Sequence, residues 1–472
     1  MLAGNQLTNK IFFQNEKKTT GVLNLSKPKL LLISPIAAKS IMGKDFYFRL
    51  PTLGLLKVAA LTPDGWDINI VDEKAEPIDL NQDADLVGIT SMTPAVNRGY
   101  EIADHFRARG IKVVMGGMHP SKMPEEALQH ADSVVIGEAE GLWPGVLEDF
   151  KHGKLKKIYK HSAYPSLVNI GIADWELYRN KRYLPVHFVE TTRGCPHDCD
   201  FCSVTNSFGG KFRSRPVDEV ENEVRQLKHF DGRFILKNMV FFVDDNIISN
   251  RAYAREFFKR IAPYNLKWLG QASVNVASDD EILRLMKQSG CLGLLVGFET
   301  LSNNNLNTVG KNFNHPDKYI DVIKKLHDHG IGVNGAFVFG LDDDDEGVFD
   351  RTREFVVKAK LDVCYFSILT PYPGTVLYER LRKEDRIIDN DWSNYTTSSV
   401  VYRPKKMTPE KLLDGYYDAY RGAFTYSSIF KRLWGNGTYK NFFWPMNFGF
   451  KQSIEKSVER LKAMENSSLR NS

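Results

Sequence analysis

Three of the five cysteines in this chain lie close together in the segment TTRGCPHDCDFC, residues 191–202. Cys195, Cys199 and Cys202 are spaced C-x3-C-x2-C. A disulfide uses two thiols, and a structural zinc site usually has four nitrogen or sulfur ligands. A set of three thiolates indicates a different kind of metal centre, one with a coordination position left open. A zinc site completed by His197 or by a distant ligand is the alternative, although His197 lies inside the loop, where its ring has little room.

Iron–sulfur clusters are held by cysteine thiolates, usually four for a four-iron cluster. Three thiolates would therefore leave one iron free to bind another molecule. Cys291 and Cys364 stand alone in predicted strands or at their edges. Cysteine is among the most buried residue types, so we expect these two to be packing residues.

The cysteine segment must be positioned by the strand that precedes it, which opens a series of alternating strands and helices. The series predicts strands at 187–194, 239–246, 267–274, 292–300, 332–340 and 362–374, separated by helices at 217–230, 252–262, 279–290, 316–330 and 346–360. Six such units are too few to close an eight-stranded barrel. We expect a partial, open (β/α)6 barrel with ligands at the carboxyl ends of its strands.

A shorter series of the same kind comes first in the chain. Continuous apolar runs such as KLLLIS predict strands buried on both faces. The strands are expected at 29–34, 68–73, 84–91, 112–117 and 133–138, with helices at 50–62, 99–110 and 125–130. This alternation predicts a doubly wound, Rossmann-like parallel sheet, whose ligand-binding loops would be residues 91–94, 116–120 and 137–140.

The cysteine motif, with Phe201 before the last cysteine, resembles the radical S-adenosylmethionine (SAM) superfamily. The resemblance implies that Cys195, Cys199 and Cys202 hold a 4Fe–4S cluster whose open iron binds S-adenosylmethionine. The segments VDDN (243–246), GFET (297–300), GAFVFG (335–340) and TPYPGT (370–375) also resemble segments of that family. They imply a catalytic candidate, Tyr372, and cofactor contacts from Asp244, Asp245, Asn246, Gln271, Ser273, Glu299 and Gly335.

The α/β domain ahead of the half-barrel resembles the cobalamin-binding domain of one subgroup of radical enzymes. The resemblance implies cofactor contacts from Ser91, Met92, Thr93, Gly116, Gly117, Gly137 and Glu138. The Asp-x-His-x-x-Gly loop that supplies a cobalt ligand in cobalamin mutases is absent from the sequence. We expect His119 to make an ordinary hydrogen bond in its loop. The alternative is an α/β domain that serves only as a scaffold.

The two resemblances together imply a methylase-like enzyme that uses two molecules of S-adenosylmethionine per turnover, one to methylate cobalamin and one to generate a radical at an unactivated substrate carbon. One alternative is a non-methylating enzyme such as an anaerobic magnesium-protoporphyrin ester cyclase. Another, from a different class, is a non-catalytic iron–sulfur redox or sensor protein. The resemblance also implies an electron donor of flavodoxin or ferredoxin type.

Four acidic residues, Asp342–Asp345, follow the strand at 332–340. We expect them to cap the next helix rather than to bind a metal ion, since carboxylates favour helix N-termini.

The aromatic segment WGNGTYKNFFWPMNFGF (434–450) has three interpretations. It could cap the open barrel, form a wall for a large apolar substrate such as an isoprenoid lipid or a tetrapyrrole, or contact a membrane surface with Lys431, Arg432, Lys440 and Lys451.

The whole chain divides, by these patterns, into a lead-in (1–28), a cobalamin-binding domain (29–150), a linker (151–186), a radical SAM core (187–380) and a helical C-terminal domain (381–472). The net charge of +5 over 472 residues gives no argument for nucleic acid as a partner. Few cysteines, no signal-peptide pattern and no spanning apolar run favour a cytoplasmic enzyme, with peripheral membrane contact left open.

Overall fold

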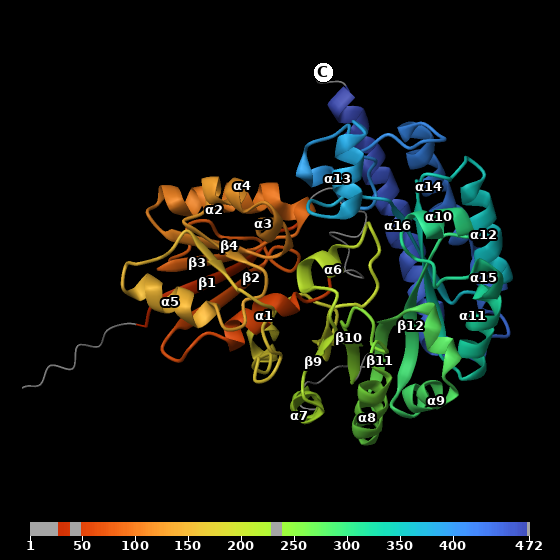
Figure 1. Cartoon of the computed structure of the whole chain (residues 1–472), viewed down its shortest axis with the longest axis horizontal. Coiled ribbons are helices and arrows are strands. Elements are labelled where there is room, and N and C mark those ends of the chain that lie inside the picture. The colour runs from red at the N-terminus through yellow and green to blue at the C-terminus, as the bar shows by residue number, and fades with distance from the viewer. Residues whose placement is uncertain (1–26, 38–48, 228–237, 470–472) are drawn as a thin grey trace, which may run out of the picture.

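The structure is a computed structural model that describes residues 27–37, 49–227 and 238–469. The expected lead-in, residues 1–28, lies almost entirely outside these ranges. Figure 1 shows two α/β units side by side, with the N-terminal unit in red to yellow and the larger unit in green to blue.

The first unit contains a parallel sheet of six strands in the order β2-β1-β3-β4-β5-β6. Its strands are β1 (Lys29–Ser34), β2 (Asp67–Asp72), β3 (Leu86–Thr90), β4 (Lys112–Gly116), β5 (Ser133–Ile136) and β6 (Ile158–Lys160). All six run parallel. Five buried residues follow Lys29 in β1, as expected for a strand covered on both faces.

Helices cover both faces of this sheet (Figure 1). Leu30 and Leu32 pack with residues of α1 (Leu53–Ala60) and α5 (Trp143–Lys151). Leu31 and Ile33 pack with α2 (Val96–Ala108) and α4 (Pro124–His130) on the opposite face. A short helix, α3 (Met118–Lys122), follows β4. The predicted doubly wound fold is therefore confirmed.

The segment predicted as a linker contributes to this sheet. Its residues 158–160 form β6, which pairs with β5. Three residues surrounded by lysines give too short an apolar pattern to be recognised as a strand in the sequence, so the pairing partner decides the structure here. Residues 151–186 are therefore more than a linker.

The second unit contains six parallel strands in the order β14-β13-β12-β11-β10-β7, and its two outer strands do not pair with each other. They are β7 (His187–Val189), β10 (Met239–Phe242), β11 (Lys267–Ala272), β12 (Cys291–Glu299), β13 (Gly332–Phe339) and β14 (Val363–Ile368). The helices between them are α7 (Val217–Leu227), α8 (Arg251–Ile261), α9 (Asp280–Gln288), α10 (Asn303–Thr308), α11 (Tyr319–Asp328) and α12 (Val348–Lys358). The predicted open (β/α)6 barrel is confirmed.

The first predicted strand of this unit, residues 187–194, is interrupted. It forms β7 and then β8 (Thr192–Arg193), which pairs antiparallel with β9 (Arg213–Ser214). The chain between β8 and β9 contains the cysteine segment and a short helix, α6 (Ser203–Phe208). This hairpin places the cysteines at the carboxyl end of the barrel strands.

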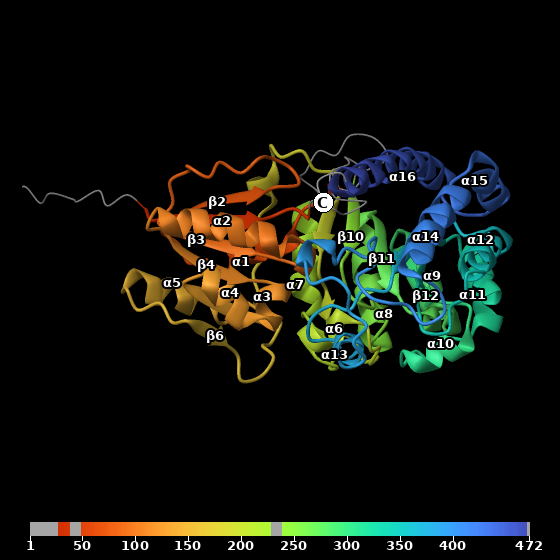
Figure 2. The same ribbon diagram turned by 90° about the horizontal axis from the view of Figure 1, so that it is seen from above.

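The C-terminal part consists of α13 (Val376–Lys383), α14 (Pro409–Ala423), α15 (Tyr426–Leu433) and α16 (Lys440–Leu469). Figure 2 shows α16 running along one side of the second unit. Phe443 is buried against Gly332, where an added Cβ would lie 2.3 Å from its ring. Gly332 begins β13, so Phe443 packs at the amino end of that strand, whereas Trp434 and Phe448 of the same aromatic segment are 64% and 38% exposed. A substrate wall formed by Phe443 is excluded, because its ring is buried in this packing.

The prediction that Arg432 could face a membrane surface is wrong, because its side chain is buried. It is fully buried and donates to the main-chain oxygens of Leu361 and Asp362 and to Oδ1 of Asn447. A guanidinium with several acceptors at fixed positions is held inside by those bonds. Among the residues that the structure describes, no helix is both long and apolar enough to cross a membrane.

Candidate active site between the two domains

The cysteine loop, residues 195–202, rests on the segment that follows α10. The amide of Asp200 donates to the oxygen of Val309 at 3.2 Å. Gly310 has a φ of 72° and lies so close that an added Cβ would be 2.7 Å from the oxygen of Asp198. His197 stacks on Phe313 with ring centroids 3.8 Å apart.

The three cysteines are half-buried free thiols. Burial raises the pKa of Cys195 and Cys202, and it raises the pKa of Cys199 to about 12. Charges on the neighbouring cysteines raise the pKa of Cys199 further, and Lys311 opposes the shift. Within the described ranges, no three His, Cys, Asp or Glu side chains converge closely enough to hold a single metal ion. Cys291 and Cys364 are buried in β12 and β14, as expected.

Asp244 and Asp245 position the cysteine loop from the end of β10. Asp244 is fully buried, and its Oδ1 accepts from the amides of Thr191 and Thr192 at 2.7 and 2.9 Å. Asp245 accepts from the amide of Gly194 at 3.0 Å. Burial raises the pKa of Asp244 to about 7 and that of Asp245 to about 6. In this structure the Asp244 carboxylate is used to shape the break between β7 and β8.

Glu299 ends β12 and has a charged partner that the sequence did not indicate. Its carboxylate forms a buried ion pair with Lys311, whose ammonium also donates to the oxygen of Gly297 at 3.2 Å. A buried carboxylate needs such a partner. Glu299 also has a φ of +66°, a left-handed backbone that costs a non-glycine residue about 1–2 kcal/mol. Backbone strain of this kind clusters at functional sites.

Asn246 and Ser273 are hydrogen-bonded to each other, with Asn246 Oδ1 3.3 Å from the amide of Ser273. Gln271 lies beside them on β11 and is half-buried. Gly335 differs, because an added Cβ would meet Leu361 at 2.7 Å and Phe298 at 3.2 Å. Its Cβ position therefore faces the core packing, and close packing accounts for the glycine.

Tyr372 lies in the turn after β14, where its main-chain oxygen accepts a hydrogen bond from the amide of Thr375 at 3.1 Å. Burial raises the pKa of Tyr372. Gly374, in the same turn, approaches both Asn206 of α6 and Lys122 of the first unit. Three segments that are distant in the sequence therefore meet beside the cysteine loop.

The four aspartates 342–345 were predicted to cap the next helix, and they mainly organise the loop instead. Asp344 accepts from the amides of Gly340 and Leu341 at 2.9 and 3.0 Å. The residue that caps α12 is Gly347, whose amide donates to Asp345.

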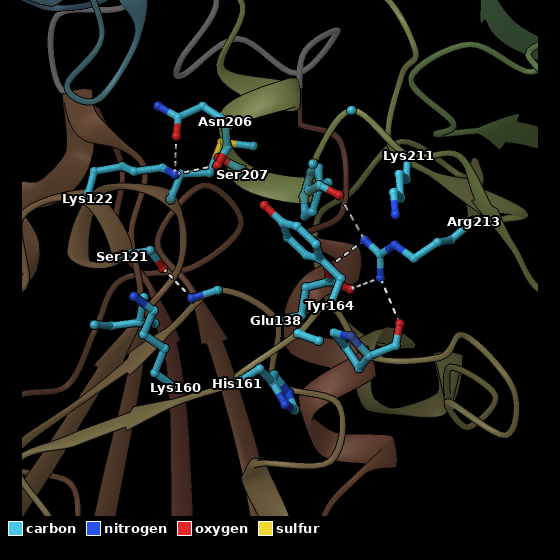
Figure 3. Close-up of a pocket in the computed structure, with 18 of the residues that line it drawn as sticks. Ser121, Lys122, Glu138, Lys160, His161, Tyr164, Asn206, Ser207, Lys211 and Arg213 are labelled. Atoms are coloured by element: carbon cyan, nitrogen blue, oxygen red, sulfur yellow. Dashed lines mark hydrogen bonds and ion pairs between the residues drawn. The ribbon is translucent and has the colours of Figure 1, made fainter.

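The loops of the first unit meet the second unit at a cavity of about 950 Å³. Figure 3 shows that side chains of both units line it. Of the predicted cofactor residues, Gly117, Gly137 and Glu138 line this cavity, and Gly116, Gly117 and Gly137 line a smaller one of about 70 Å³ beneath the loops. An added Cβ on Gly137 would meet no atom within 4 Å, so a ligand has open space there.

Ser91, Met92 and Thr93 do not line either cavity. Ser91 is buried, and its amide donates a hydrogen bond to the main-chain oxygen of Gly116, the last residue of β4. Thr93 contacts the buried ring of His119 at 3.2 Å. His119 therefore makes an ordinary hydrogen bond, as predicted.

Buried ion pairs join the loop after β5 to the strand that leads into the cysteines. Arg193 bonds Glu138 and Glu140 of the first unit and Glu190 of its own unit. Arg213 also bonds Glu138, at 2.6 Å. Glu138 was predicted to contact a cofactor, and here it pairs with two arginines across the domain boundary. Nothing in the local sequence marks these arginines, because their partners are far away along the chain.

The residues fit the expected cofactors. Three free thiols in one loop, beside an end of β12 that carries strained Glu299, suit a cluster and its ligand. Cys195, Cys199 and Cys202 would hold the cluster, and the residues expected to contact S-adenosylmethionine, Glu299, Asn246 and Ser273, lie at or just beyond the carboxyl ends of neighbouring strands. Gly116, Gly117 and Gly137 line the two cavities at these loops and would hold cobalamin there.

Comparisons with known proteins agree with this division. Residues 39–147 match the model of the B12 binding domain, residues 189–356 match the radical SAM superfamily, and residues 375–466 match a domain of unknown function, DUF4070.

Two methyltransferases of Chlorobaculum tepidum resemble most of the chain. Bacteriochlorophyllide d C-12(1)-methyltransferase is 33% identical over 431 residues, which are 90% of this chain and 92% of that protein. Bacteriochlorophyllide d C-8(2)-methyltransferase is 31% identical over 386 residues, covering 78% and 84%. The solved structure of the radical SAM methyltransferase TsrM from Kitasatospora setae has the same fold, with a TM-score of 0.66, 14% identity and coverage of 93% and 99%.

Proposed function

Because the chain belongs to the radical SAM enzymes that carry a B12-binding domain, with a 4Fe–4S cluster, S-adenosylmethionine and cobalamin as cofactors, we propose that it methylates an unactivated carbon of a large apolar substrate. The substrate class that we propose is a tetrapyrrole, by similarity to relatives named for such substrates. The observation that carries the proposal is the cavity shared by the cobalamin-side loops and the helix that follows the cysteines.

The bound cofactors would supply the radical and the methyl group, so the chain's own residues bind, orient and exclude water. The buried ion pairs of Arg193 fix the cysteine hairpin against the loop after β5. Asp244 and Asp245 hold the start of the cysteine loop through its amides. We propose Tyr372, at the carboxyl end of β14, as the catalytic candidate that faces the substrate side. An external electron donor of flavodoxin or ferredoxin type belongs to this proposal.

The test is an anaerobic assay of the reconstituted enzyme with S-adenosylmethionine, a reductant and bacteriochlorophyllide d, analysed by mass spectrometry. Methyl transfer predicts a methylated pigment with equal amounts of S-adenosylhomocysteine and deoxyadenosine. Deoxyadenosine alone would favour a non-methylating enzyme such as a cyclase. A stable cluster with neither product would favour a non-catalytic iron–sulfur protein.

We also propose that exposed aromatic residues on α15 and directly after it give the enzyme a peripheral contact with anionic lipid. Tyr426 is 67% exposed and Trp434 is 64% exposed. Phe430 stacks on Trp434 at 4.8 Å, and Lys451 lies over Tyr426 at 4.9 Å. Rings beside lysines suit the headgroup region of a bilayer.

Sedimentation with phosphatidylserine vesicles tests this contact. We expect Trp434→Ser to reduce the bound fraction severalfold, whereas Val376→Ser, at an equally exposed residue on α13, should leave it unchanged. Equal binding by the wild type and Trp434→Ser would contradict a lipid contact.

A further inference from the structure

The loop after β4 lines the cofactor cavity on both sides of His119. Gly117 and Met118 come before His119 and line the larger cavity. Ser121 and Lys122 come after it and line the same cavity. The ring of His119 is fully buried and does not line either cavity. The position of this buried ring therefore sets the course of the loop on both sides of it.

The ring of His119 is held by a carboxylate that also binds the C-terminal part of the chain. Nε2 of His119 lies 3.3 Å from Oε1 of Glu126 in α4. The same oxygen accepts the indole N–H of Trp392 at 3.1 Å and the hydroxyl of Tyr100 at 2.9 Å. Because a carboxylate only accepts hydrogen bonds, Nε2 of His119 carries a proton and donates it. Burial opposes ionisation, but these three hydrogen bonds lower the pKa of Glu126, so the carboxylate is charged.

Trp392 follows α13 in the chain, yet its indole packs with the first unit. It begins a short 3-10 helix, Trp392–Asn394, and packs against the apolar core that α2 and α4 share with the first sheet. Its ring centroid lies 5.0 Å from that of His119, at an angle of 66°. Asn97 of α2 also donates to Asp391 of this segment, at 2.7 Å. In Figure 1 the light-blue chain around α13 lies beside the orange end of the first unit.

The other end of this segment is fixed at the mouth of the barrel. The main-chain oxygen of Thr397 accepts from the amide of Ile368, the last residue of β14, at 2.7 Å. Thr397 has a φ of +60°, which is rare for a β-branched residue. Between the two ends, Tyr395 is fully buried and donates to the oxygen of Asp389 at 2.8 Å. Residues 389–397, which lie within the matched domain of unknown function, therefore connect the carboxyl end of β14 to the loop after β4.

We propose that Trp392 is a positioning residue for cobalamin, which holds the loop after β4 in place through Glu126 and His119. A loop that is already fixed before its ligand arrives loses less conformational entropy on binding, so the affinity is higher. The C-terminal domain thereby contributes to a cofactor site in the first unit. This inference rests on cobalamin as a cofactor and not on the proposed methyl transfer.

The test is an absorbance titration with hydroxocobalamin of the full-length chain, purified without cobalamin and with its cluster reconstituted. The Tm of each protein without cobalamin is measured in parallel. Trp392→Phe keeps an aromatic ring beside His119 and removes the indole N–H. Glu126→Ala removes the shared acceptor, whereas Glu126→Gln keeps an amide oxygen that still accepts hydrogen bonds.

Two control variants separate this role from general effects on the fold. Trp268→Phe also removes an indole N–H, which donates to Ser289 inside the second unit. Trp268 is fully buried, so its variant should lower the Tm at least as much as Trp392→Phe does. Asn97→Ala removes the hydrogen bond to Asp391 and so tests whether docking of the segment alone is enough.

We expect Trp392→Phe to bind cobalamin about fivefold more weakly than the wild type, the effect of about one hydrogen bond. Glu126→Ala should bind more weakly still, and Glu126→Gln should recover part of the affinity. Trp268→Phe and Asn97→Ala should bind like the wild type. An unchanged affinity of Trp392→Phe overturns the inference. An equal loss of affinity in either control also contradicts it, because destabilisation or simple docking would then be the cause.

The titration measures binding without turnover, so its result does not depend on the methyl transfer. If the variants bind as expected but no pigment is methylated, the proposed function fails and the role of Trp392 stands. If a pigment is methylated and Trp392→Phe binds cobalamin normally, only the role of Trp392 fails.

Discussion

Cys199 is the middle cysteine in the sequence of the loop that Asp244, Asp245 and Gly310 hold in place. Because a four-iron cluster needs each of its protein thiolates, we expect Cys199→Ala to lose the brown cluster absorbance and all deoxyadenosine production. Absorbance and product analysis of anaerobically reconstituted protein measure both.

The control is Cys364→Ala, since Cys364 is buried in β14 and isolated from the loop. This variant should keep the cluster and its reactivity. A Cys199→Ala protein that still assembles a full cluster would rule out this set of ligands.

The buried carboxyl group of Asp344 should make the free energy of unfolding depend on pH. Burial raises its pKa from the ordinary 3.8 to about 7. Between these values the folded protein holds a proton that the unfolded chain has lost. The stabilising contribution is therefore present at low pH and is lost as the pH rises through 7. We expect the difference in Tm between wild type and Asp344→Asn to fall from pH 5 to pH 7 by about 2–4 °C per pH unit at most.

Differential scanning fluorimetry of the apoprotein in matched buffers measures this difference. The neighbouring exposed residue provides the control, because Lys406 lowers the pKa of Asp343. Asp343→Asn should therefore show no trend in this pH window. A constant difference for Asp344→Asn would mean that its carboxyl group titrates normally.

At the scale of elements, Phe443 of α16 packs against the strands of the barrel. Phe443 fills the space left by Gly293 and Gly332 at the amino ends of β12 and β13. Removing a buried Phe side chain costs about 3–5 kcal/mol, so Phe443→Ala should lower the Tm by many degrees. Phe448→Ala, on the same helix but 38% exposed, should change it little. The Tm of both variants is measured by thermal unfolding. Equal decreases in Tm would contradict the packing role of Phe443.

The elements themselves were largely predictable, with informative exceptions. Apolar periodicity indicated every strand of both sheets except β6, whose three residues between lysines carry no pattern. The strand predicted at 187–194 breaks because Asp244 captures the amides of Thr191 and Thr192. The strand predicted at 362–374 ends at Ile368, since the Pro-containing turn that follows cannot continue a ladder.

At the scale of the whole molecule, the relative position of the two units depends on buried charges. Glu140 bonds Arg193 at 2.6 Å, and both are buried. Breaking one partner of a buried pair costs about 3–5 kcal/mol because a charge is left unpaired. We expect Glu140→Gln to loosen the interface, with a larger radius of gyration in X-ray scattering and about tenfold faster trypsin cleavage between the units.

Glu148→Gln, an exposed residue of α5 in the same unit, is the control and should behave like wild type. Unchanged scattering and cleavage for Glu140→Gln would show that this ion pair is not needed to fix the arrangement, because Glu138 still pairs with Arg193 and Arg213.

The sequence by itself determined the order of the elements, the cysteine spacing and the family, because these depend on periodicity and on residues close together in the chain. The tertiary structure alone decided which charges meet. Lys311 pairs with Glu299, and Arg193 pairs with Glu138 and Glu140. Arg432 is buried among acceptors from the residues just before β14 and from α16. Pairs between distant segments leave no local signal, since either partner alone looks like an ordinary charged surface residue.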